Sequence, residues 1–157
     1  MSLKISVRVY GILMNEKNEV LVSDEYIRGE YYTKFPGGGL EIGEGTRACL
    51  QREFKEEMDL NVSIGDHIYT TDFFQQSAFN SAHQIIAIYY FAKALEPIKV
   101  ALREKEFDFD DDQRLKYSEE KQIESFRFIA WENFTADKLT LPIDKIVVSQ
   151  LKTTFKK

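Results

Sequence analysis

The sequence predicts an α/β protein in which a mixed β-sheet lies between helical layers. Several segments alternate apolar and polar residues or form short apolar runs, and both patterns are typical of β-strands. One segment with helical periodicity lies between these strands, and a second follows them near the C-terminal end. Strands that are interrupted by one helix and followed by another favour a sheet covered by helices.

The elements expected before the central helix are two strands, the turn between them and a glycine-rich turn. Ile5, Val7 and Val9 alternate with polar neighbours and should place one side of the first strand in the core. In chain order, we expect a strand over residues 4–14, a turn at 15–18, a strand at 20–22, and a segment at 31–35 that leads into the turn Pro36–Gly39.

The central helix is predicted to run from about Thr46, as its N-cap, to about Met58. Leu50, Phe54 and Met58 recur every four residues and form an apolar stripe along it. This stripe should dock on the core, so that the neighbouring face of the helix can point its side chains into a cleft.

Three glutamates crowd that neighbouring face. A helix turns about 100° per residue, so Glu53, Glu56 and Glu57 fall within an arc of about 100°. Like charges at this spacing cost roughly 0.2–0.5 kcal/mol per pair in an isolated helix. Each glutamate alone would fit a solvated surface, but the joint pattern favours a bound cation. Oxygen ligands suit hard cations such as Mg²⁺ or Mn²⁺.

The second half of the chain is expected to contain three more strands, a charged segment and a terminal helix. Asp108, Asp110, Asp111 and Asp112 make the charged segment a long loop or partly ordered insertion, which Phe107 and Phe109 could pin down. In order, we expect strands at 61–74 and 83–94 joined by a loop at 75–82, the charged loop at 99–121, a strand at 125–130, a turn or short helix starting at 131–134, and a helix at 143–155 with Ile146, Val147 and Leu151 on one face.

The stretch from Gly38 to Leu60 resembles the Nudix box, G-x5-E-x7-R-E-U-x-E-E-x-G-U, in which U is a bulky aliphatic residue. Charged residues at fixed spacing make this a specific motif. Two positions depart from it. Phe54 is aromatic, and Asp59 replaces the glycine that ends the helix; Asp tolerates left-handed backbone geometry, so the turn should persist. The matching residues are Gly38, Glu44, Arg52, Glu53, Glu56, Glu57 and Leu60.

The resemblance implies a single Nudix domain over residues 1–157, with an α/β/α sandwich fold. It also implies an enzyme that cleaves the pyrophosphate of a nucleoside diphosphate linked to another group, with Mg²⁺ or Mn²⁺ as cofactor. Glu53, Glu56 and Glu57 would hold the ions. Glu44 would be a further ligand or a supporting carboxylate, and the Gly38 carbonyl an additional ligand.

The same resemblance assigns the remaining catalytic roles. Arg52 would pair with a box glutamate and fix its rotamer. Glu53 is one candidate for the general base. Many relatives use a glutamate on a loop before the last strand, and Glu119 and Glu120 stand at that place here. Residues 72–76 contain neither the proline nor the tyrosine that hints at the substrate in some relatives, so the nucleotide derivative stays open.

The composition of the chain restricts the kinds of partner and substrate that we expect. The net charge of −5 disfavours long nucleic acid, and an anionic nucleotide substrate would need bridging cations to enter an acidic site. We expect no membrane span and no signal peptide, and the single cysteine, Cys49, fits a buried, inert thiol in the cytoplasm. A homodimer is compatible with this composition. The alternative to an enzyme is a noncatalytic nucleotide-sensing or partner-binding domain of the same family.

Overall fold

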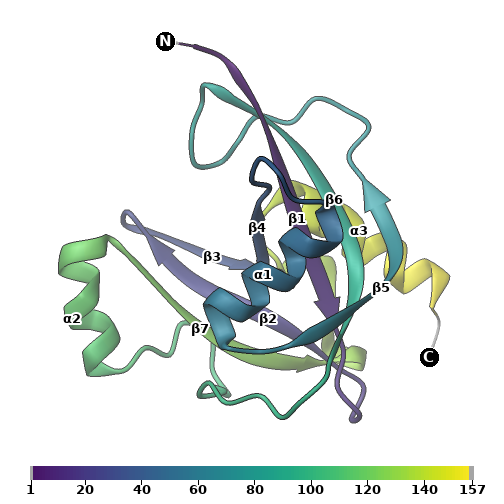
Figure 1. Cartoon of the computed structure of the whole chain (residues 1–157). Helices are drawn as coiled ribbons and strands as arrows, with labels where there is room; N and C mark the ends of the chain where they lie inside the picture. Colours follow the sequence, from purple (N-terminus) through teal and green to yellow (C-terminus); the bar gives the residue numbers. More distant parts are fainter. Residues whose placement is uncertain (1, 156–157) are drawn as a thin grey trace. The chain divides into compact units, whose positions relative to one another are not determined.

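A computed structural model describes residues 2–155 (Figure 1). The chain forms two compact units. The first contains the described residues up to Leu13 together with Pro36–Lys99, and the second contains Met14–Phe35 and the described residues from Val100 onward. The predicted α/β class is confirmed, with three α-helices and two β-sheets among the described residues.

The first unit is a mixed sheet with one helix against it. Its sheet has the strand order β4-β1-β6-β5; β1 pairs with β6 in parallel, whereas β4 and β5 pair with their neighbours antiparallel. The predicted mixed sheet is therefore confirmed. Its elements are β1 (Lys4–Leu13), β4 (Gly37–Gly39), α1 (Thr46–Met58), β5 (Val62–Thr70) and β6 (His83–Ala94).

Helix α1 lies against this sheet (Figure 1), and Leu50 and Phe54 of the predicted apolar stripe contact β1 at Gly11. Leu50, Phe54 and Met58 are all buried, and full burial of such a side chain contributes roughly 1.5–3 kcal/mol. The helix approaches β1 closely because Gly11 has no side chain there: a Cβ at that position would lie 2.8 Å from the Phe54 ring. This contact fixes which face of α1 meets the sheet and which face carries the carboxylates.

Both ends of α1 show how the local sequence defines it. The N-cap is Gly45 rather than the expected Thr46, whose hydroxyl instead hydrogen-bonds the Tyr90 hydroxyl at 2.7 Å. Asp59 ends the helix in the left-handed conformation, with φ 49° and ψ 42°, so the turn expected at the usual glycine position is confirmed. Lys55 and Lys99 both pair with the Asp59 carboxylate at 2.7 and 3.4 Å.

The second unit is an antiparallel sheet with strand order β3-β2-β7. Helix α3 packs through Ile143, Val147, Val148 and Leu151, which are buried, whereas Ile146 is 39% exposed and does not share that face as expected. Its elements are β2 (Glu19–Ile27), β3 (Glu30–Lys34), α2 (Asp111–Glu120), β7 (Gln122–Ala130), the short 3-10 helices η1 (Trp131–Asn133) and η2 (Ala136–Lys138), and α3 (Pro142–Thr154).

The prediction of a charged loop over residues 99–121 is wrong in part, because residues 111–120 form helix α2. An Asp110 carboxylate accepts from the Gln113 backbone at 2.8 Å, and the Gln113 side chain accepts from the Asp110 backbone at 2.9 Å, which completes a capping box. The helix buries none of its own residues and attaches through the Tyr117 ring, stacked on Tyr26 at 4.6 Å. Phe107 contacts Tyr31, as the anchoring role predicted.

Several boundaries also differ from the prediction, most of all that of the strand expected at 20–22, which spans Glu19–Ile27. The strand expected over 61–74 ends at Thr70, and the last strand begins at Gln122 rather than at residue 125. The glycine turn contains a short strand, β4, because Gly37, Gly38 and Gly39 pair with β1. Glycine has little intrinsic strand preference, so this strand depends on its partner rather than on its own sequence.

Candidate active site

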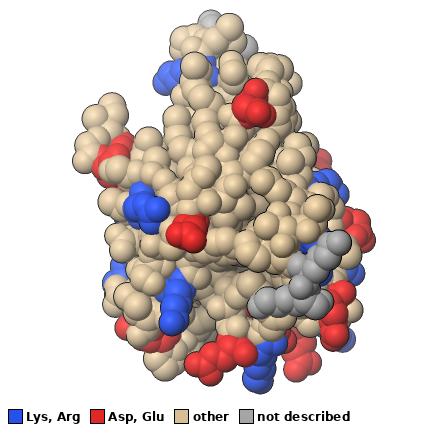
Figure 2. Space-filling view, turned by 90° about the vertical axis from the view of Figure 1, so that its right-hand side faces the viewer, with Lys and Arg blue, Asp and Glu red and all other residues tan. Residues whose placement is uncertain are grey.

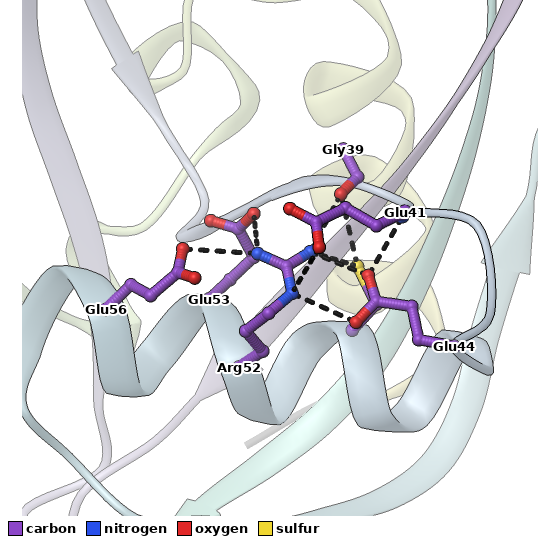
Figure 3. Close-up of polar contacts among 7 residues, drawn as sticks. Gly39, Glu41, Glu44, Arg52, Glu53 and Glu56 are labelled. Carbon is purple, nitrogen blue, oxygen red and sulfur yellow. Dashed lines mark hydrogen bonds and ion pairs between the residues drawn. The ribbon is translucent and has the colours of Figure 1, made fainter.

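An arginine-centred cluster lies on α1 and the segment that precedes it (Figure 3). The Arg52 guanidinium donates from Nε to Glu44 Oε2 at 2.9 Å and from Nη2 to Glu44 Oε1 at 2.7 Å. This two-point contact is the strong geometry for an arginine and a carboxylate. Nη2 also donates to the Gly39 carbonyl at 3.0 Å, which ties the helix to β4.

The remaining guanidinium nitrogen reaches the box glutamates. Arg52 Nη1 lies 3.0 Å from Glu53 Oε1 and 3.2 Å from Glu56 Oε2. The expected pairing of Arg52 with box glutamates is therefore seen. The Glu53 side chain is 13% exposed and the Glu56 side chain is 58% exposed. The contact with Glu53 is therefore largely shielded from water, whereas the contact with Glu56 is not. Glu41 lies further out, at 3.7 Å from Arg52 Nε.

Arg52 and the carboxylates around it stabilise one another in their charged forms. The hydrogen bond from Arg52, followed by that from the Glu41 backbone N–H, lowers the pKa of Glu44 to about 2. The carboxylates in turn raise the pKa of Arg52, chiefly through the Glu44 hydrogen bond. Glu44 therefore stays ionised across the physiological pH range, and so does Arg52.

Glu53 lies directly against the backbone of β4. A Cβ built on Gly38 would be 2.4 Å from Glu53 Cδ and Oε1 and 2.6 Å from Oε2, so only glycine leaves room for this carboxylate. Gly38 pairs with Val9 of β1, which fixes the strand beneath the carboxylate. The first glycine of the box thus sets the position of the glutamate fifteen residues later.

Cys49 lies on the same helix but is not a candidate nucleophile. Its side chain is buried, and this burial raises the pKa of the thiol to about 12. The Sγ atom contacts the Gly39 carbonyl at 3.6 Å. The thiol is thus buried, as expected, and too weakly acidic to form a thiolate at neutral pH.

The structure brings five of the predicted site residues together. Gly38, Glu44, Arg52 and Glu53 form one contiguous group with Glu56. Glu57 occupies a half-buried position in the last turns of α1.

The two further candidates for the general base belong to the second unit. Glu119 and Glu120 are exposed and form the end of helix α2, so the loop location expected for them is wrong. The helix forms there because the capping box at Asp110 starts it, ten residues before Glu120.

Sequence analysis missed two participants. The Gly39 carbonyl accepts from Arg52, a backbone role that no side-chain pattern indicates. Glu41 contributes a second acidic group and the backbone N–H that donates to Glu44 at 2.9 Å. The spacing of Glu41 and Glu44, three residues apart before the helix, is the signal that could have found it.

The donor set fits a hard divalent cation by chemistry and charge, although its carboxylates face Arg52. Glu53 and Glu56 offer oxygen ligands on one helical face (Figure 3), and the Glu53 carboxylate lies against the backbone of Gly38. Within residues 2–155, no three His, Cys, Asp or Glu side chains converge closely enough to hold an ion in their present rotamers.

A glycine-rich strand followed by a carboxylate-bearing helix on a mixed sheet is the arrangement of a Nudix-type protein. A model of the NUDIX domain family matches residues 4–147, and the chain belongs to this family. It is a Nudix hydrolase, an enzyme class whose fold and site support cleavage of a pyrophosphate bond. Nudix hydrolases generally use divalent metal ions and act on small nucleotide derivatives.

Solved structures share this fold at low sequence identity. The MutT protein from Methanosarcina mazei Go1 is 17% identical, with a TM-score of 0.68, over 100% of this chain and 99% of that one. A NUDIX hydrolase from Nitrosomonas europaea is 14% identical, with a TM-score of 0.67, over 95% and 89% of the two chains. An ADP-ribose pyrophosphatase from Streptococcus suis 89-1591 is 11% identical, with a TM-score of 0.57, over 97% and 94%. No match was found among curated proteins.

Two further properties concern large partners. None of the helices formed by the described residues is both long and apolar enough to cross a bilayer. On the face drawn in Figure 2, the described basic and acidic side chains are interspersed, and no continuous basic patch is seen among them.

Proposed function

We propose that this protein hydrolyses the pyrophosphate bond of a nucleoside diphosphate linked to another moiety, and that it requires Mg²⁺ or Mn²⁺. The observation that carries this proposal is the cluster around Arg52. One guanidinium is shared by Glu44, Glu53 and Glu56, so the group retains excess negative charge beside a glycine strand. A site of this charge would repel a pyrophosphate unless cations accompanied it.

Glu53, Glu56 and Glu57 would hold the ions, with the Gly38 carbonyl and Glu44 as further candidates. A bound Mg²⁺ or Mn²⁺ supplies positive charge that screens and polarises the phosphoryl group. Glu53 would also be a candidate to accept a proton from the attacking water, because Gly38 leaves room for its carboxylate beside β4.

Glu119 and Glu120 are the other candidates for the general base. Substitution by glutamine, one residue at a time, separates them from Glu53. Loss of the base lowers kcat and changes the acidic limb of the pH–rate profile, whereas loss of a surface charge changes neither.

A substrate panel tests the proposal. Purified protein is incubated with nucleotide sugars, dinucleotides and nucleoside triphosphates, each with Mg²⁺, with Mn²⁺ and with chelator. We expect release of a nucleoside monophosphate or pyrophosphate from at least one member, only in the presence of an ion. Folded protein that turns over none of them would contradict the proposal.

A matched pair of variants assigns the activity to the helix. Glu57→Gln should lower turnover by about a hundredfold or more, because a neutral amide is a poor ligand for a hard cation. Glu16→Gln, in the exposed turn before β2, removes the same charge and should leave turnover intact. Equal turnover of both variants would refute the role of Glu57 as a ligand.

A further inference from the structure

We propose that Arg52 takes the place of the divalent ion in the metal-free protein, and that Glu53 and Glu56 exchange Arg52 for the ion while Glu44 keeps Arg52 anchored beside the site. This inference deepens the proposed function and rests on it. Of the three glutamates that hydrogen-bond to Arg52, Glu44 stays with the arginine, and Glu53 and Glu56 change partner.

The anchored side of Arg52 is closed and fully bonded. Glu44 accepts from both Nε and Nη2 at 2.9 and 2.7 Å, and its Oε1 also accepts from the Glu41 backbone at 2.9 Å. The Gly39 carbonyl takes the second hydrogen of Nη2 at 3.0 Å. Only 16% of the Glu44 side chain is exposed. Releasing Glu44 would break several charge-assisted hydrogen bonds at once, so this contact should persist.

The exchangeable side is a single nitrogen shared by two carboxylates. Nη1 contacts Glu53 at 3.0 Å and Glu56 at 3.2 Å, one bond to each (Figure 3). Glu56 is mostly exposed, and ion pairs of this kind contribute only about 0–1 kcal/mol. A divalent ion that contacts several oxygens directly outweighs such a bond.

Arg52 alone does not neutralise the carboxylates that surround it. Ion pairs join the one arginine to Glu41, Glu44, Glu53 and Glu56, which leaves the group about three charges negative. The carboxylates turn toward the guanidinium, and no three acidic groups in the described chain converge on a common point. Glu53 reaches Nη1 through Oε1 and Glu56 through Oε2, and we expect both carboxylates to turn from Nη1 toward an ion that they bind.

The exchange predicts that removing Arg52 raises the affinity of the protein for the ion. A residue that merely orients metal ligands lowers ion affinity by about 10–100-fold when it is removed. A cation that competes for the same carboxylates and repels the ion does the opposite. We expect Arg52→Gln to bind Mn²⁺ more tightly, by about threefold to tenfold, while the metal-free variant unfolds a few degrees below the wild type.

Titration calorimetry with Mn²⁺ alone, on chelator-treated protein, measures the first effect, and thermal unfolding measures the second. Arg47→Gln is the matched control, because Arg47 lies on α1 but donates to the Ile64 and Gly65 carbonyls. Its Mn²⁺ affinity should equal that of the wild type. An Arg52→Gln affinity that is unchanged or weaker overturns the inference, whereas a wild type that binds no Mn²⁺ overturns the proposed function itself.

A measurement on the wild type covers the case in which Arg52→Gln does not fold. The Arg52 Nε–H gives its own nitrogen–proton NMR signal, and Glu44 protects it. Saturating Mg²⁺ should leave this signal protected from exchange with water, because the anchor persists. Loss of the signal on addition of Mg²⁺, to the level seen in Glu44→Gln, would show that Glu44 leaves Arg52 and would overturn the inference.

Discussion

Replacement of Gly38 by alanine tests how closely β4 positions the Glu53 carboxylate. The new Cβ would lie 2.4 Å from Glu53 Cδ and Oε1, whereas ordinary contacts of this kind begin at 3.4 Å. The carboxylate must therefore move by about 1 Å to reach an ordinary contact distance. Gly38 has no positive φ, so the backbone itself accepts alanine.

A displacement of about 1 Å in a catalytic group costs about a hundredfold in rate, so kcat/KM of Gly38→Ala should fall by about that factor. The cost in stability should be small, about 1 kcal/mol, because the atoms that must yield belong to a flexible side chain. Steady-state hydrolysis and urea unfolding measure the two effects. Gly65→Ala on β5 is the control, since its Cβ would meet only Phe91 at ordinary distance. Gly38→Ala activity within about threefold of the wild type would refute the reasoning.

Three further predictions concern the first unit. Gly37→Ala should prevent stable folding, as seen by circular dichroism, because its Cβ would lie 2.0 Å from a backbone carbonyl of β1 at a φ of 147°; a native-like spectrum would contradict this. Hydrogen bonds from Lys55 and then Lys99 lower the pKa of Asp59, so the stability it adds is present above the ordinary aspartate pKa and lost as the pH falls through the depressed value. Asp59→Asn should therefore be less stable than the wild type at neutral pH and converge with it in acid, as urea unfolding would show; a difference independent of pH would be inconsistent with these ion pairs. Cys49 should react with a thiol reagent only after denaturation, since it is buried and its pKa is raised to about 12; rapid labelling of native protein would argue against that burial.

The central helix could be predicted because its signals are local. The apolar stripe indicated α1 and the face that it buries, and the left-handed tolerance of Asp indicated its end at Asp59, whereas the N-cap is Gly45 and not Thr46. The box spacing also gave the group around Arg52, since residues 52, 53 and 56 share one helical face.

What sequence reasoning missed depends on partners distant in the chain or on a cap outside the apolar pattern. Strand β4 consists of glycines and exists because it pairs with β1. Helix α2 has no apolar stripe, and only the Asp110–Gln113 capping box signals its start.

Buried ion pairs of the second unit were also invisible to pattern reasoning. Asp24 pairs with Arg127 at 2.6 Å, and Glu25 with Lys34 at 3.1 Å, although charged residues in a strand usually indicate a solvated face. Adjacent residues on β2 thus carry buried charges, and their partners lie on neighbouring strands. Such pairs become recognisable only when the strand register is known.

The central claim is that the carboxylates of α1 make this chain a divalent-ion-dependent pyrophosphohydrolase. The most direct measurement is hydrolysis of the substrate panel in isotopically labelled water, followed by mass spectrometry of the products. The account predicts that one labelled oxygen enters a phosphate product, with Mg²⁺ or Mn²⁺ present and not with chelator. Turnover that persists equally in chelator, or label that is absent from every phosphate, would contradict it.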